Sequence, residues 1–137
     1  MTTAPRDAPS LRTLAMPADT NPNGDIFGGW ILAQMDLAGG TYAWHIAQGR
    51  VATVAITGMN FLKPVYVGDE VSVYCSTHRI GNTSIAVNVE VWVRRGTSKH
   101  SLDETDGTEE RVTEGLFTFV AIDRSGTPRP VKQARTS

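Results

Sequence analysis

The most regular pattern in the chain is a strict alternation of residue type. Apolar residues occupy every second position from Ile85 to Val93, which predicts a strand with one buried face. Residues 11–16 indicate a short first strand that Pro17 closes. Gly58, inside a long β-rich run, indicates a bulge or a close backbone approach. The remaining strands are predicted over 51–64, 70–78 and 112–122.

One segment has a different pattern. From Trp30 to Gln48 apolar residues follow one another with few polar interruptions, which predicts a helix stopped by Gly49. Because this helix is apolar almost all round, we expect it to be buried. Residues 21–29 are dense in turn formers and predict a loop. One long buried helix and an antiparallel sheet indicate the α+β class.

The 137 residues suit one domain with its own core. We predict a folded domain over 11–123, between a disordered N-terminal tail at 1–10 and a flexible C-terminal tail at 124–137. The polar, mostly acidic stretch 96–111 predicts a solvated hairpin loop.

Charge and composition exclude several classes of function. A formal net charge of −1 gives no general affinity for nucleic acid or anionic lipid. No apolar run approaches the ~20 residues that span a bilayer, and the N-terminus lacks the apolar core of a signal peptide, so we expect a cytoplasmic protein. The single cysteine, Cys75, is in strand phase with Val71 and Val73, which indicates a core residue rather than a nucleophile. The three histidines are scattered, so no metal site is predicted.

Asp36 is the only acidic residue between Trp30 and Gln48. The residues three and four positions away are Leu, Ala, Gly and Gly, so no neighbouring cation can pair with it on the helix. Burying an unpaired carboxylate costs several kcal/mol, which makes Asp36 a candidate functional residue. Two structural explanations stay open: Asp36 reaches solvent at a subunit edge, or it accepts backbone hydrogen bonds.

The start of the helix offers hydrogen-bond donors. First-turn N–H groups have no partner within a helix, and Gly28 and Gly29 let a substrate carbonyl approach them closely, as in an oxyanion hole. The alternative for these two glycines is a tight turn. Asp36 follows Gly29 by seven residues on the same helical face, so one ligand could meet both. The simplest interpretation of Gly39-Gly40 is close packing of the helix on the sheet or on a partner subunit.

A series of motifs runs through the chain. In order these are LRTLAMPADTN (11–21), NGDIFGGW (23–30), QMD (34–36), GRV (49–51), GMNF (58–61), KP (63–64), VGD (67–69) and VEVWV (89–93). Together they closely resemble the YciA-type acyl-CoA thioesterases over about residues 11–131, with the tails and the loop 96–111 outside the resemblance. The resemblance implies a hotdog fold, in which a curved antiparallel sheet of about five strands wraps one long helix.

The resemblance also implies roles for residues and for assembly. Asp36 resembles the family's catalytic carboxylate, Asn23 its loop residue that positions substrate or water, and the Gly28 and Gly29 amides its oxyanion donors. It implies homodimers with active sites at the subunit interface, often assembled as hexameric trimers of dimers. The chemistry is consistent, because a thiolate leaving group with a pKa of about 8.5 needs no strong general acid.

The phosphates of coenzyme A need Lys or Arg. The candidates are Lys63, Arg94 and Arg95, for which the alternative is an ordinary solvated strand end. Asn60 is a candidate to line the pantetheine channel, or it satisfies a bulge at Gly58. No cofactor is expected beyond the coenzyme A carried by the substrate.

We therefore expect an enzyme that hydrolyses acyl-CoA to free acid and CoA. The alternatives are a non-catalytic acyl-CoA-binding oligomer and a hotdog hydratase or dehydratase, although no histidine precedes His45. Acyl chain length, physiological pathway, nucleotide regulation and the choice between general base and nucleophile stay open. Trp44 and His45 depart from the family pattern, which bears on the acyl pocket.

Overall fold

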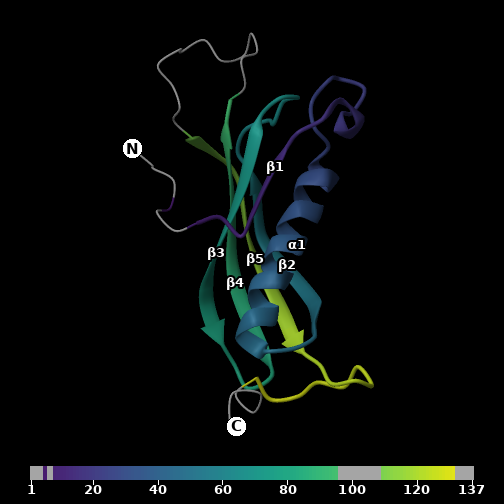
Figure 1. The fold of residues 1–137 in the computed structure, drawn as a ribbon, viewed down its shortest axis with the longest axis vertical. Coiled ribbons are helices and arrows are strands. Elements are labelled where there is room, and N and C mark those ends of the chain that lie inside the picture. The colour runs from purple at the N-terminus through teal and green to yellow at the C-terminus, as the bar shows by residue number, and fades with distance from the viewer. Residues whose placement is uncertain (1–4, 6–7, 96–108, 132–137) are drawn as a thin grey trace.

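The computed structural model describes residues 5, 8–95 and 109–131. A single antiparallel sheet with strand order β1-β3-β4-β5-β2 packs against one long helix (Figure 1). This confirms the predicted α+β class. The elements are β1 (Leu11–Leu14), the 3-10 turn η1 (Pro17–Asp19), α1 (Gly28–Ala47), β2 (Val51–Phe61), β3 (Glu70–Ile80), β4 (Ser84–Arg94) and β5 (Glu109–Ala121).

The core lies between α1 and the inner face of the sheet. The apolar alternation over Ile85–Val93 is confirmed, since every second residue of this run is 0% exposed. Gly39 brings the helix close to the sheet: a Cβ there would lie 3.1 Å from Cζ of Phe119. Close packing of the helix on the sheet, as predicted, therefore explains Gly39.

The prediction that α1 is buried all round is wrong for the single chain. Leu37 is 60% exposed and Trp44 is 49% exposed, because the sheet of the same chain covers one side of the helix. The end of the helix also differs from the prediction. Gln48, not a glycine, adopts the left-handed conformation (φ 54°), and the Arg129 side chain reaches Ala47 O at 2.9 Å through Nη2.

The folded domain extends beyond the predicted boundary at residue 123. Val131 is 1% exposed, and its N–H donates to Asn82 O at 2.8 Å. The predicted C-terminal tail 124–137 is therefore wrong up to Val131, and its remainder lies outside the described residues, as do most of the predicted tail 1–10 and residues 96–108 of the predicted loop. The last strand begins at Glu109 rather than 112 because it pairs with β4 as far as Arg94.

β2 forms one edge of the described sheet. The bulge predicted at Gly58 is confirmed by its φ of +61° and by the register shift between Thr57 and Asn60. Apolar side chains near this edge stay exposed, including Val54 at 56% and Phe61 at 55%. Within the described part of the chain, no helix combines the length and apolarity needed to cross a membrane.

Candidate active site

Asp36 lies in the middle of α1, on the flank beside β2. The hydroxyl of Thr53, in β2, donates a hydrogen bond of 2.7 Å to Asp36 Oδ1. Asp36 is partly buried, and none of the described residues donates to its other oxygen, Oδ2. The expected fully buried, unpaired carboxylate is thus a half-satisfied one, held by a side-chain hydroxyl rather than by backbone amides. One oxygen is fixed and the other can accept a hydrogen bond from water or substrate.

Sequence reasoning missed Thr53. It is one polar residue in a β-rich run, and no spacing connects it to a residue 17 positions earlier. The contact depends on how β2 lies beside α1. A polar residue within an apolar strand is the one signal that could have suggested it.

An open cavity of about 520 Å³ surrounds this carboxylate. Its apolar walls include Leu37, Val51 and Phe119, and this volume is in the range of small-molecule sites. A second cavity of about 530 Å³ lies on another flank of α1, beside Tyr42 and Thr77, and its described lining contains no carboxylate. The cavity that contains Asp36 is therefore the candidate active site.

Gly28 and Gly29 begin α1 as predicted to within two residues. Neither backbone N–H donates to another described residue, so both stay available to a ligand. Gly28 lines a cavity of about 330 Å³ with Phe61, Leu62 and Lys63. These amides lie at a different place from Asp36, because seven helical residues span roughly 10 Å along the axis. One carbonyl cannot contact both on a single chain, although a long ligand could pass both.

Asn23 lies in the loop before α1 and is exposed. Its backbone N–H donates to Asn21 Oδ1 at 2.9 Å, which shapes the loop. Asn23 does not line the cavity around Asp36. One chain therefore does not bring the predicted catalytic residues together, because Asn23, Gly28 and Gly29 all lie outside the lining of the Asp36 cavity.

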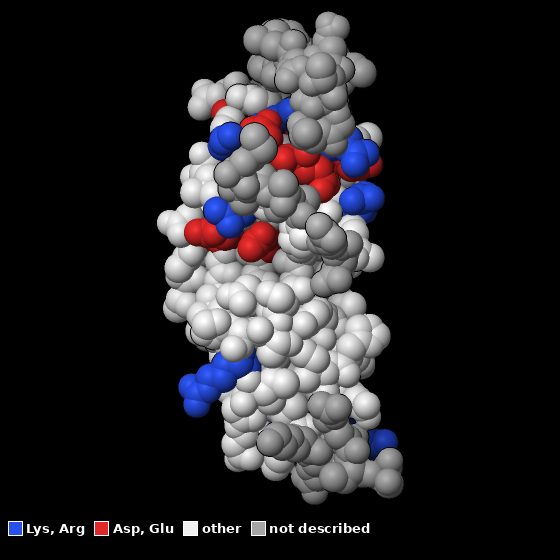
Figure 2. All heavy atoms as spheres, turned by 90° about the vertical axis from the view of Figure 1, so that its left-hand side faces the viewer, with Lys and Arg blue, Asp and Glu red and all other residues white. Residues whose placement is uncertain are grey.

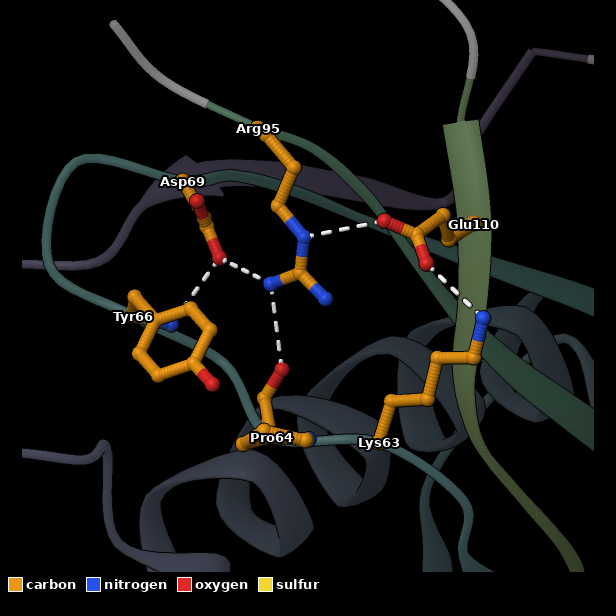
Figure 3. A network of polar contacts seen from close by, with 6 residues as sticks. All are labelled: Lys63, Pro64, Tyr66, Asp69, Arg95 and Glu110. Carbon is orange, nitrogen blue, oxygen red and sulfur yellow. Dashed lines mark hydrogen bonds and ion pairs between the residues drawn. The ribbon is translucent and has the colours of Figure 1, made fainter. Parts of the chain in front are cut away.

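Arg95 does not have the freedom expected of a phosphate-binding residue. Its guanidinium donates to Asp69 at 2.6 Å, to Glu110 at 3.0 Å and to the carbonyl of Pro64 at 3.1 Å (Figure 3). It also lies over the Tyr66 ring at 5.2 Å, and its side chain is 13% exposed. Arg95 thus joins the end of β4 to β5 and to the segment before β3.

The other predicted CoA-binding residues are more accessible but already have partners. Lys63 Nζ lies 2.9 Å from Glu110 Oε1 and Arg94 Nη1 lies 3.6 Å from Glu70 Oε1, while both cationic side chains are about half exposed. Asn60 donates to Gly58 O at 3.2 Å. This contact favours the bulge explanation for Asn60 over the pantetheine channel.

Cationic and acidic side chains lie next to one another around Lys63, Arg94 and Arg95. Figure 2 shows Lys and Arg side chains next to Asp and Glu over the upper half of one face, with a largely uncharged lower half. The hydrogen bond from Lys63, with further donation from Arg95, lowers the pKa of Glu110. The Glu110 carboxylate is therefore ionised at neutral pH.

Neither Cys75 nor a metal ion offers a second catalytic centre among the described residues. Burial raises the pKa of the Cys75 thiol, so the thiolate is disfavoured at neutral pH and the core interpretation of Cys75 is supported. Among the described residues, no group of three or more His, Cys, Asp or Glu side chains is placed to hold a metal ion.

Comparison with known proteins agrees with this geometry. The family model of the thioesterase superfamily matches residues 23–99, more than half of the chain. Among solved structures, the hexameric hotdog fold thioesterase Cj0915 of Campylobacter jejuni superposes with a TM-score of 0.83 at 40% identity, covering 94% of each chain. The hexameric thioesterase y2039 from Yersinia pestis gives a TM-score of 0.81 at 53% identity, covering 93% of this chain and 97% of that chain. The predicted hotdog fold of the thioesterase class is confirmed.

Curated relatives narrow this class. The acyl-CoA thioester hydrolase YciA of Salmonella typhimurium is 51% identical over 131 residues, which cover 96% of this chain and 95% of the relative. YciA of Escherichia coli K12 is 53% identical over 119 residues, with coverage of 87% and 86%. The chain belongs to the family of YciA acyl-CoA thioester hydrolases.

Proposed function

We propose that this enzyme hydrolyses fatty or short acyl-CoA thioesters to free acid and CoA, with Asp36 as the catalytic carboxylate. The observation that carries the proposal is the carboxylate in an apolar-walled cavity, with Oδ1 held by Thr53 and Oδ2 unbonded among the described residues. The relatives named above are acyl-CoA thioester hydrolases. Membership of their family supports the same reaction here.

The proposed reaction uses few groups. Asp36 accepts a proton from water while the water oxygen bonds to the thioester carbon, or Asp36 attacks that carbon directly. The Gly28 and Gly29 amides stabilise the oxyanion. The carbon–sulfur bond then breaks with its electron pair on sulfur, and the thiolate of CoA takes up the proton that Asp36 accepted from water. In the direct-attack route this step leaves an acyl–Asp36 anhydride, which water then hydrolyses to the free acid and the Asp36 carboxylate, and that water supplies the proton taken up by the thiolate. No cofactor takes part in this scheme.

The scheme requires two copies of the chain. The amides of Gly28 and Gly29 lie roughly 10 Å along α1 from Asp36, which is too far for one thioester carbonyl to reach both. We propose that Asp36 of one protomer acts with Gly28, Gly29 and Asn23 of a partner. The apolar side chains at the β2 edge are exposed in the single chain, with Val54 at 56%, and a second copy of the chain could pack against them. The solved neighbours are described as hexameric, and we expect at least a dimer and a hexamer at full assembly.

The phosphates of CoA are proposed to bind at Lys63 and Arg94, whose side chains are 54% and 48% exposed. We do not include Arg95 among the residues that contact the phosphates, because its guanidinium already donates to three acceptors within the chain. Lys63→Gln is expected to raise KM for acyl-CoA with little change in kcat. An unchanged KM would exclude Lys63 from the binding site.

The decisive experiment measures thiol release from a panel of acyl-CoAs by the wild-type enzyme and Asp36→Asn. The substitution keeps the shape and removes the charge, and loss of a general base should lower kcat by about 10²–10⁴. Glu90→Gln, a carboxylate on β4 that does not line the Asp36 cavity, is the matched control and should retain activity. Circular dichroism and mass measurement establish that each variant is folded and assembled.

Two outcomes favour other functions. A wild-type protein that binds acyl-CoA without releasing thiol would be the non-catalytic binding oligomer. A protein that consumes trans-2-enoyl-CoA without releasing thiol would be the hydratase or dehydratase. If Asp36→Asn is folded and still active, the protein is a thioesterase whose mechanism does not depend on Asp36.

A further inference from the structure

The cavity around Asp36 extends in one direction along α1. Asp36, Gly40 and Trp44 are spaced by four residues, so they lie on the same face of the helix, and all three line the cavity. Eight helical residues separate the first from the last, which corresponds to roughly 12 Å. The cavity thus leads from the carboxylate toward the C-terminal end of α1 and reaches Trp44.

The cavity suits an apolar chain rather than the coenzyme. Leu37, Val51 and Phe119 supply apolar walls, and Asp36 is the lining residue of α1 that lies nearest the start of the helix. Thr41, His45 and Thr53 add polar groups to the lining. Given the proposed function, the thioester carbon must lie beside Asp36. The acyl chain is the apolar part of the substrate that begins at this carbon, whereas the coenzyme side carries amides and phosphates. Apolar contact therefore favours the acyl chain as the occupant.

The two adjacent glycines of α1 have different neighbours. A Cβ at Gly39 would lie 3.1 Å from Phe119 Cζ and 3.4 Å from Val89 Cγ2, so this position is closed by packing. A Cβ at Gly40 would meet only Phe119 Cε1, at an ordinary 3.7 Å. Packing against the sheet therefore explains Gly39 and does not explain Gly40. Because glycine in a helix interior is destabilising relative to alanine, Gly40 needs another reason, and its place on the cavity wall supplies one.

Trp44 limits the far end of the cavity. Its side chain is large, yet it is 49% exposed in the single chain. An aromatic side chain left half exposed beside an apolar cavity is suited to contact a ligand. We propose that this cavity holds the acyl chain of the substrate, that Gly40 keeps it open next to the reacting carbon, and that Trp44 sets the chain length it accepts. This inference rests on the proposed function.

The test is the dependence of kcat/KM on acyl length, from acetyl-CoA to palmitoyl-CoA, measured by thiol release. Gly40→Ala should lower kcat/KM for long chains relative to acetyl-CoA, by about fourfold for each excluded methylene, which corresponds to ~0.8 kcal/mol. Trp44→Ala should move the preferred chain to greater length. Trp44→Phe should give an intermediate profile.

Gly39→Ala is the matched control. It makes the same change in helix propensity at the next position, but its methyl group meets Phe119 instead of the cavity. We expect it to lower the melting temperature and leave the chain-length profile unchanged. A profile readout separates specificity from stability, because a partly unfolded enzyme loses activity on all chains in proportion.

The outcomes are distinguishable from those of the proposed function. If the wild-type enzyme releases thiol but neither Gly40→Ala nor Trp44→Ala changes the profile, the acyl-chain assignment is wrong. The same conclusion holds if Gly39→Ala changes the profile as much as Gly40→Ala. If Gly40→Ala fails to fold, the chain-length profiles of Trp44→Ala and Trp44→Phe still test whether the cavity holds the acyl chain. If the wild-type enzyme releases no thiol from any acyl-CoA, the proposed function itself fails.

Discussion

Thr53→Val removes the hydroxyl that donates to Asp36 Oδ1 at 2.7 Å and keeps the branched shape of the side chain. Hydrogen bonds to charged groups contribute about 1.5–3 kcal/mol. Thr53 is exposed and Asp36 is partly exposed in the single chain, so we take a value just below this range, ~1–1.4 kcal/mol, because solvent weakens the bond. Since ~1.4 kcal/mol is a tenfold change in rate, kcat should fall about five- to tenfold. This is much less than the effect expected for Asp36→Asn.

The assay is steady-state thiol release, with kcat and KM determined separately. Because the bond orients the carboxylate and does not bind substrate, kcat should fall while KM stays within about twofold. Thr53→Ser keeps the hydroxyl and should retain most of the activity. In a double-mutant cycle, Thr53→Val should have little further effect once Asp36 has been replaced by asparagine. The reasoning is refuted if Thr53→Val matches the wild type, or if its effect is undiminished in the Asp36→Asn background.

Three further predictions concern residues away from the carboxylate. Arg95→Met removes the 2.6 Å contact to Asp69, which is 0% exposed and keeps its hydrogen bond from the Tyr66 N–H. This variant should lower stability by about 1.5–3 kcal/mol in chemical denaturation, and an unchanged denaturation midpoint would contradict this. Hydrogen bonds from Lys63 and Arg95 lower the pKa of Glu110 in the folded protein. The ionised Glu110 therefore stabilises the fold fully above the ordinary carboxyl pKa of about 4.3. This stabilisation is lost as the pH falls through the lowered pKa of the folded state. Glu110→Gln should therefore lower stability at pH 7 by at most ~1 kcal/mol, given the partial exposure of this pair, and the difference from wild type should disappear near pH 2 in urea titrations. Because burial raises the pKa of the Cys75 thiol, this cysteine should react slowly with iodoacetamide at pH 7, and Cys75→Ala should keep kcat within about twofold of wild type.

The parts of the fold that the sequence predicts are those that local pattern determines. The alternation over Ile85–Val93 requires a strand with one buried face whatever its neighbours are, and this strand is confirmed. The burial of α1 could not be predicted in the same way. An apolar helix surface indicates that it is buried, but it does not indicate whether the same chain or another chain buries it. Leu37 and Trp44 are exposed because the chain's own sheet covers one side of the helix.

The candidate site divides along the same line. Asp36 could be found because it is chemically unusual among its own helical neighbours. Thr53 could not be found, because its role comes from the placement of β2 beside α1. Val131 was placed in a tail because a short polar and Pro-rich segment has no periodicity, and its burial depends on contacts such as that with Asn82, 49 positions earlier.

The network around Arg95 shows how two cations predicted for the same role separate in the structure. A phosphate that binds Lys63 must replace Glu110, whose Oε1 lies 2.9 Å from Lys63 Nζ. Glu110 then keeps a partner, because Arg95 Nε still donates to its Oε2 at 3.0 Å (Figure 3). Without Arg95, releasing Lys63 would leave the carboxylate unpaired and close to the incoming phosphate, which is unfavourable. We therefore expect Arg95 to assist the proposed phosphate binding through Glu110 without touching the phosphate, while Lys63, with Arg94, makes the direct contact.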